Sequence, residues 1–199
     1  MRLAVLLSGR GSNFAAIREA LAAGRLEGSI VVVISNRAGA PGLAKARSWG
    51  YTAHVIDERQ FEGRSEHEEA VRRALDAAAP DFIVLAGYMR LLSPSFVASY
   101  PSRILNIHPS LLPAFPGVNA QAQALAHGVK ISGCTVHFVD EGLDAGPIIV
   151  QRAVEVLDDD TVETLSLRIL AQEHVAYVEA LRLLGSGAYR IEGRRVVAG

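Results

Sequence analysis

Short apolar segments alternate with helical patterns over the first 106 residues, and this alternation constrains the fold more than any other feature. The apolar segments are nearly continuous in hydrophobicity, as strands covered on both faces are; they span residues 3–7, 30–35, 52–56, 82–86 and 104–107. Helical patterns lie between them, at residues 13–23, 42–49, 65–79 and 94–99. Elements in this order predict an α/β fold with a doubly wound, mostly parallel sheet.

The rest of the chain has a different pattern. Residues 132–140 and 148–156 are extended, and the turn-rich stretch EGLDAGP between them predicts later strands that are partly antiparallel. A long amphipathic C-terminal helix is expected over residues 161–184, and YRIEGRRVV predicts a small hairpin after it. Because we find no internal repeat, low-complexity segment or linker, we expect one domain over residues 1–199.

Composition excludes several classes of function. Half of the residues are apolar and 21% are charged, which is typical of a globular chain. The net charge of −1 provides no broad field for nucleic acid or an acidic membrane surface. No run approaches the ~18 apolar residues of a membrane span, so we expect a cytoplasmic protein. The single cysteine, Cys134, excludes an internal disulfide and is expected to pack in the core.

A glycine loop follows the first apolar segment. The stretch SGRGSN, residues 8–13, leads directly into a helical pattern, a junction that aims backbone N–H groups at one point and favours an anion. It is not a P-loop, because Gly-Lys-Ser/Thr is missing. Phe14 stands where a dinucleotide site needs a small residue, and the second strand ends without a carboxylate. The loop therefore predicts a phosphate monoester site, with a plain tight turn as the alternative.

Two polar side chains end the strand at residues 104–107. Asn106 and His108 lie two residues apart and share a face, at the edge where open α/β sheets bind ligands. An amide beside an imidazole suits an oxygen that gains negative charge during a reaction. Asp140, Glu141 and Asp144 crowd the later turn DEGLDAG. These residues alone leave two interpretations open, a catalytic cluster or a structural strand end with a solvated acidic turn; none has metal-ligand spacing.

Four stretches of the chain follow one another in this order: LLSGRGSN, LAGYMRLLSP, NIHPSLLPAFPG and HFVDEGLDAGPII. Together they resemble the phosphoribosylglycinamide formyltransferases, which are folate-dependent enzymes of purine biosynthesis. The resemblance implies a Rossmann-like formyltransferase fold. It also implies that the amine of glycinamide ribonucleotide attacks the formyl carbon of 10-formyltetrahydrofolate, a co-substrate, to give formylglycinamide ribonucleotide and tetrahydrofolate. No metal is implied. The partners would be these small molecules, without nucleic acid or membrane, and the enzyme would be a monomer or homodimer.

The resemblance also implies roles for individual residues. The catalytic residues would be Asn106, His108 and Asp144: the imidazolium of His108 would stabilise the oxygen of the tetrahedral intermediate and act as general acid, while Asp144 would keep it protonated and help to relay protons. The substrate-binding residues would be Gly11, Ser12 and Asn13 at the phosphate, with Gly87, Ile107, Pro109 and Glu173. The folate-binding residues would be Arg64, Met89, Arg90, Leu91, Leu92, Asn106, Val139, Asp140, Glu141 and Asp144.

Three further expectations accompany these roles. Arg64 would lie near the glutamate tail of the folate. Leu170 departs from the basic or polar residue that relatives often carry near the phosphate. Residues 118–128 are expected to form a mobile lid, which is ordered only when both ligands are bound.

Other formyl-folate enzymes offer alternative functions. Methionyl-tRNA formyltransferase shares the Asn-His-Asp chemistry but carries a further domain for tRNA, and we expect none here because the chain shows no basic stripe. Formyltetrahydrofolate hydrolase carries an extra N-terminal domain, whereas the first strand here is expected from residue 2. A non-catalytic ligand-binding module of the same fold would not need Asp144.

Overall fold

Parallel strands build the sheet of residues 1–105, the first of two compact units in this computed structural model of residues 1–199. In this N-terminal unit the strand order is β3-β2-β1-β4, and each neighbouring pair is parallel. The strands are β1 (Arg2–Leu7), β2 (Ser29–Ser35), β3 (Ala53–Val55) and β4 (Phe82–Leu85). The helices are α1 (Ser12–Ala22), α2 (Pro41–Ser48), the 3-10 turn η1 (Glu58–Gln60), α3 (Arg64–Ala78) and α4 (Pro94–Ala98).

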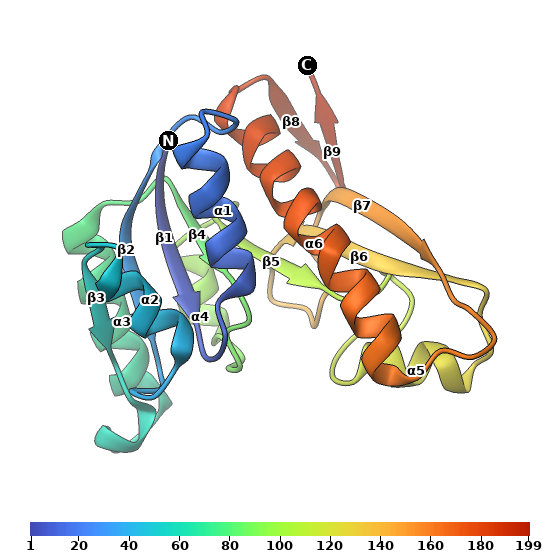
Figure 1. Ribbon diagram of the computed structural model, residues 1–199. Helices are drawn as coiled ribbons and strands as arrows, with labels where there is room; N and C mark the ends of the chain where they lie inside the picture. The colour runs from blue at the N-terminus through green and yellow to red at the C-terminus, as the bar shows by residue number, and fades with distance from the viewer. The chain divides into compact units, whose positions relative to one another are not determined.

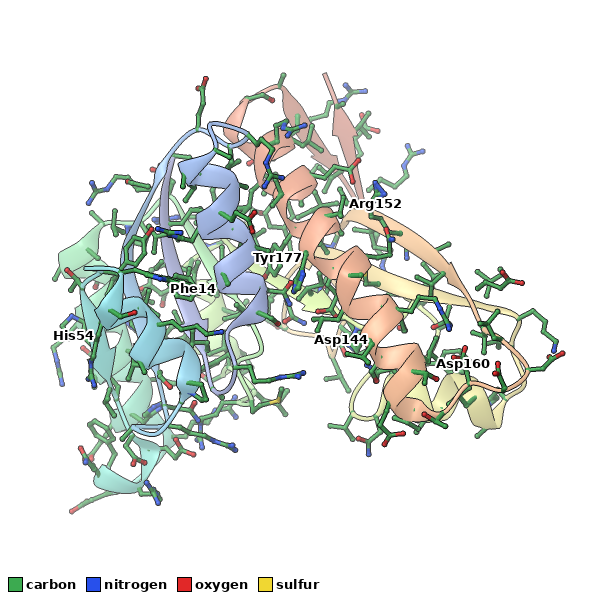
Figure 2. The ribbon with its side chains drawn as sticks, in the orientation of Figure 1. Phe14, His54, Asp144, Arg152, Asp160 and Tyr177 are labelled. Atoms are coloured by element: carbon green, nitrogen blue, oxygen red, sulfur yellow. The ribbon has the colours of Figure 1, made fainter.

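Burial explains why these segments form a covered sheet. Leu3 to Leu7 of β1 are all fully buried, as expected for a strand with helices over both faces. Figure 1 shows α1 and α2 on the viewer's side of these strands. Phe14 of α1, labelled in Figure 2, is fully buried and meets the ring of Trp49 at a centroid distance of 5.5 Å. The core of this unit therefore lies between the strands and their helices.

The position of β1 defines the ligand-binding edge of the N-terminal unit. The chain leaves β1 for β2 on one side, while β4 pairs on the other, so β1 lies at a topological switch point. The loop after β1 and the segment after β4 both leave the carboxyl edge. The Ser8 N–H donates to the carbonyl of Gly87 at 3.0 Å, which places the two segments side by side.

Residues 106–199 form the second, C-terminal unit. Strand β5 (Ile104–His108) ends in it, followed by α5 (Ala120–Ala126), β6 (Ile131–Phe138), β7 (Ile148–Glu155), α6 (Val162–Gly185), β8 (Tyr189–Glu192) and β9 (Arg195–Ala198). Strands β6 and β7 are antiparallel, as are β8 and β9, while β7 and β9 are parallel. The long helix α6 packs on β6 and β7. It begins with a capping box between Thr161 and Thr164.

Most expected elements are confirmed within two residues at each end. The expected antiparallel pair, the long C-terminal helix and the terminal hairpin are all present. Cys134 is buried as expected, and burial raises the pKa of its thiol to about 12. The segment expected to be a lid contains the helix α5, and its mobility stays a prediction. No helix is both long and apolar enough to cross a membrane. The expectation of one domain over residues 1–199 also stays a prediction.

Candidate active site

His108 lies between two hydrogen-bond acceptors at the end of β5. Its Nδ1 is 3.3 Å from Oδ2 of Asp144, and its Nε2 is 2.8 Å from the carbonyl oxygen of Phe115. Neither neighbouring atom carries a hydrogen that it could donate. The Nε2 contact is a hydrogen bond to the carbonyl, and the Nδ1 contact is an ion pair whenever the ring is protonated. The whole residue is 4% exposed.

Asp144, labelled in Figure 2, lies in the loop between β6 and β7. Its Oδ2 also accepts the N–H of Gly117 at 2.8 Å, so the carboxylate joins this loop to the segment after β5. Gly146 allows the loop to return close to β6, because a Cβ at this position would lie 1.9 Å from the carbonyl oxygen of Phe138. The backbone of Asp144 has a φ of 49°, an unusual value for a residue with a side chain.

The segment that carries Phe115 is held by a buried hydroxyl. Thr135 Oγ1 donates to the carbonyl of Ser110 at 2.7 Å and accepts the N–H of Leu112 at 3.0 Å. Gln151 donates to the same hydroxyl at 3.0 Å and to the Leu112 carbonyl at 2.8 Å. These bonds fix the loop, and therefore the carbonyl that faces His108.

His137 is a buried histidine of β6 for which the sequence predicts no role. Its Nδ1–H donates to the carbonyl of Phe138 at 2.8 Å, which leaves Nε2 as an acceptor for the Asn106 amide at 3.3 Å. Burial lowers the pKa of His137 and outweighs the raising effects of the Phe138 carbonyl and Asp144, so the ring is neutral at pH 7. The sequence signal that could have identified His137 is a histidine inside the apolar strand just before DEGLDAG.

The glycine loop lies at the switch point of the N-terminal unit. Gly11 has a φ of 66°, and its Cα approaches α2 so closely that a Cβ would lie 2.8 Å from the Cα of Gly42. Ser12 begins α1, and Asn13 in its first turn is buried. The N-terminal N–H groups of α1 are thus presented beside the loop, as an anion site requires.

The segment after β4 presents apolar side chains to solvent. Met89 is 69% exposed and Leu91 is 72% exposed, next to Gly87, which has a φ of 74°. Arg64 forms an ion pair with Glu68 at 3.1 Å and donates to the carbonyl of Leu91 at 2.7 Å. The structure therefore places Arg64 against the 89–92 segment.

The sequence-predicted site residues fall into two groups. In the N-terminal unit lie Gly11, Ser12, Asn13, Arg64, Gly87, Met89, Arg90, Leu91 and Leu92. In the C-terminal unit lie Asn106, Ile107, His108, Pro109, Val139, Asp140, Glu141, Asp144 and Glu173. Asp140 accepts the N–H of Gly142 at 3.0 Å, Glu141 is exposed, and Glu173 is buried on α6. The structure brings His108 and Asp144 into contact and adds His137 beside Asn106.

No cluster of three or more histidine, cysteine, aspartate or glutamate side chains is arranged to hold a metal ion. The expectation that the reaction uses no metal stays a prediction.

Comparisons with known proteins identify the family. The Formyl transferase family model matches residues 1–181. A trifunctional purine biosynthetic protein adenosine-3 of Drosophila pseudoobscura pseudoobscura is 50% identical over 191 residues, which cover 95% of this chain and 14% of that protein. The phosphoribosylglycinamide formyltransferase of Escherichia coli is 40% identical over 191 residues, which cover 96% of this chain and 90% of that protein.

A solved structure confirms the predicted fold class. The glycinamide ribonucleotide transformylase 1 from Symbiobacterium toebii has 52% sequence identity and a TM-score of 0.97, over 100% of this chain and 93% of that one. The family model and the relative matched along nearly its full length agree with this likeness, and we conclude that the chain belongs to the formyl transferase family.

Proposed function

We propose that this protein transfers the formyl group of 10-formyltetrahydrofolate to the amine of glycinamide ribonucleotide, a step of purine biosynthesis. The contact between His108 and Asp144 at the end of β5, with Asn106 oriented beside it, is the observation that carries the proposal. The relatives named phosphoribosylglycinamide formyltransferase support the choice of substrates.

The reaction begins when the amine nitrogen attacks the formyl carbon. A C–N bond forms, the carbonyl π pair moves onto oxygen, and a tetrahedral intermediate with an oxyanion results. The imidazolium of His108 and the amide N–H of Asn106 stabilise this oxygen as its charge develops. The Nε2–H of His108 has an oxygen acceptor already, the Phe115 carbonyl at 2.8 Å, and donates to the oxyanion in its place.

Proton transfer completes the reaction. The attacking nitrogen loses a proton to the carboxylate of Asp144 through water, and the same proton passes on through water to N10 of the folate as the bond from N10 to carbon breaks, which restores the carboxylate. The oxygen pair returns to form the new amide. Asp144, 3.3 Å from Nδ1 of His108, also places a negative charge opposite the imidazolium. Products are formylglycinamide ribonucleotide and tetrahydrofolate, so atoms and protons balance.

His137 acts as a positioning residue in this scheme. Its acceptor nitrogen holds one hydrogen of the Asn106 amide, which leaves the second hydrogen for the oxyanion. Because His137 is neutral, it accepts this bond without placing a second positive charge next to His108.

Binding is assigned residue by residue. Gly11, Ser12 and Asn13 hold the phosphate of the ribonucleotide through backbone N–H groups, helped by the positive end of α1. The remaining substrate contacts come from Gly87, Ile107, Pro109 and Glu173. The folate contacts come from Arg64, the 89–92 segment, Asn106, Val139–Glu141 and Asp144. The protein works on these two small molecules as a single cytoplasmic domain, as a monomer or homodimer, without metal.

An absorbance assay for tetrahydrofolate tests the proposal. Purified protein is mixed with 10-formyltetrahydrofolate, with and without glycinamide ribonucleotide, and the formylated product is identified by mass spectrometry. We expect folate release only when the amine is present, in equal amount to formylglycinamide ribonucleotide. Equal release without the amine would instead establish a hydrolase, and no release in either case would refute both activities.

A further inference from the structure

Ser8, at the start of the SGRGSN loop, is a buried residue whose N–H and hydroxyl are both hydrogen-bonded. It is 3% exposed. Its N–H donates to the Gly87 carbonyl at 3.0 Å, and its Oγ accepts the N–H of Met89 at 2.8 Å. The hydroxyl proton goes to Oδ1 of Asn36 at 2.6 Å. Ser8 therefore contacts the segment after β4 twice, from a position three residues before Gly11.

Asn36, at the end of β2, extends this contact to a second point of the same segment. It is 2% exposed, and its Nδ2 donates to Oε2 of Glu58 at 3.0 Å. Oε1 of Glu58 lies 3.4 Å from Nη1 of Arg90, and both side chains are less than one third exposed. Hydrogen bonds thus lead from the Met89 N–H to Glu58, and an ion pair joins Glu58 to the Arg90 side chain. We call Ser8, Asn36, Glu58 and Arg90 the Ser8 network.

Glu58 carries its charge in this network. Burial alone would raise the pKa of Glu58, but a backbone N–H, the Asn36 amide and the charge of Arg90 outweigh it and hold the pKa below its ordinary value. The carboxylate can therefore accept from Asn36 and attract Arg90 at the same time.

A separate pair of side chains holds the far end of the segment. Glu68 is buried and accepts the N–H of Ser93 at 2.7 Å together with the Ser93 hydroxyl. Arg64, paired with Glu68, donates to the Leu91 carbonyl. At the near end, Ser8 joins the segment to the glycine loop through its contacts with Gly87 and Met89.

We propose that the Ser8 network couples the two substrates, so that phosphate bound at the glycine loop orders the 89–92 segment for the folate. The inference rests on the proposed function for the identity of the ligands. Phosphate at residues 11–13 restrains the loop, and Ser8 transmits the restraint to Met89 and, through Asn36 and Glu58, to Arg90. A folate then binds to a segment that is already ordered, so less conformational entropy is lost on binding. Linkage requires the reverse effect to have the same size.

The test uses Ser8→Ala in the full-length chain. This change removes an acceptor for the Met89 N–H and a donor to Asn36, and so deprives one part-buried and one buried polar group of a partner. We expect the affinity for an unreactive dideazafolate analogue to fall about ten-fold. Saturating glycinamide ribonucleotide should tighten that affinity several-fold in the wild type, measured by calorimetry, and leave it unchanged in the variant.

Two further variants separate coupling from general damage. Glu58→Gln keeps an acceptor for Asn36 but removes the charge opposite Arg90, so it should reduce the coupling between the two ligands less than Ser8→Ala does. This variant still tests the proposal if Ser8→Ala fails to fold. Ser48→Ala removes an exposed hydroxyl of α2 that bonds only the Lys45 carbonyl, and it should keep wild-type coupling. In the network variants KM for the folate should rise about ten-fold, with kcat within about three-fold.

Hydrogen exchange at the Met89 amide makes the outcome independent of the reaction. Ser8→Ala should speed this exchange at least ten-fold, whether or not the wild type forms product. If the wild type transfers formyl groups while both network variants retain full coupling, the proposal is wrong and the function stands. The wild type could instead form no product while Ser8→Ala speeds Met89 exchange and abolishes the tightening of analogue binding by the ribonucleotide. In that case the proposed network stands and the proposed reaction is wrong.

Discussion

At the scale of single residues, Asp144 makes two contacts that can be tested separately. It lies 3.3 Å from Nδ1 of His108, where its charge matters, and it accepts the Gly117 N–H at 2.8 Å, where any oxygen would serve. Asparagine keeps the size and the acceptor but removes the charge. The substitution Asp144→Asn therefore tests the charge alone.

We expect Asp144→Asn to lower kcat by two or more orders of magnitude, because the imidazolium loses its partner and the amine loses its proton acceptor. The dissociation constant of the dideazafolate analogue should change less than about five-fold, since the lost interaction acts in the transition state. Asp158→Asn, at an exposed aspartate paired with Lys130, is the matched control and should keep wild-type kcat. Near-normal turnover in Asp144→Asn would remove Asp144 from the mechanism.

At the scale of elements, the glycine loop and α2 meet backbone to backbone. Gly11 has a left-handed φ and no room for a side chain, because Gly42 of α2 lies directly against it. The Gly42 N–H donates to the Gly9 carbonyl at 3.0 Å, which fixes this approach. The loop can therefore present its N–H groups only while both positions are glycine.

We expect Gly11→Ala to lower the free energy of unfolding by about 2 kcal/mol, from the strained φ and the contact with Gly42. The KM for glycinamide ribonucleotide should rise at least ten-fold, while that for glycinamide riboside, which lacks the phosphate, should change little. Gly39→Ala is the control, because a Cβ there meets nothing within 4 Å. Equal effects on the two substrates would argue against a phosphate site at this loop.

At the scale of the whole molecule, stability should depend on pH in two separate ranges. Burial holds the pKa of His137 below its ordinary value of 6.5, so the unfolded chain binds a proton first as the pH falls from 7 to 5 and stability decreases. Hydrogen bonds from Arg59 lower the pKa of Asp57 from 3.8 to about 2, and Arg168 lowers that of Asp160 further. Their contributions are present above pH 4 and are lost below it.

Urea unfolding followed by circular dichroism checks this order. As the pH is lowered from 7 to 5, we expect the urea concentration at half-unfolding to decrease. It should then change little until about pH 4 and decrease again below that pH. His137→Gln should remove the first decrease and retain the second. A variant with the wild-type decrease between pH 7 and 5 would show that His137 is not the group responsible.

The sequence by itself determined the elements and pointed to the polar residues of the candidate site. Continuous apolar strands and amphipathic helices are local patterns, so the order of β1 to β4 and the length of α6 followed from them. The sequence indicated Asn106 and His108 because these polar side chains end a buried strand. It indicated the acidic turn because three carboxylates lie among glycines there. The family resemblance then selected Asp144 from three candidate carboxylates.

Only the tertiary structure decided which side chains meet, because such contacts depend on distance in space and not along the chain. His137 orients Asn106 across 31 positions of sequence, and Ser8 reaches Met89 across 81. Arg64 pairs with buried Glu68 because α3 carries both on one face, four residues apart. A buried histidine or serine looks like ordinary core in a sequence. Its role appears only when the partner for each of its polar atoms is known.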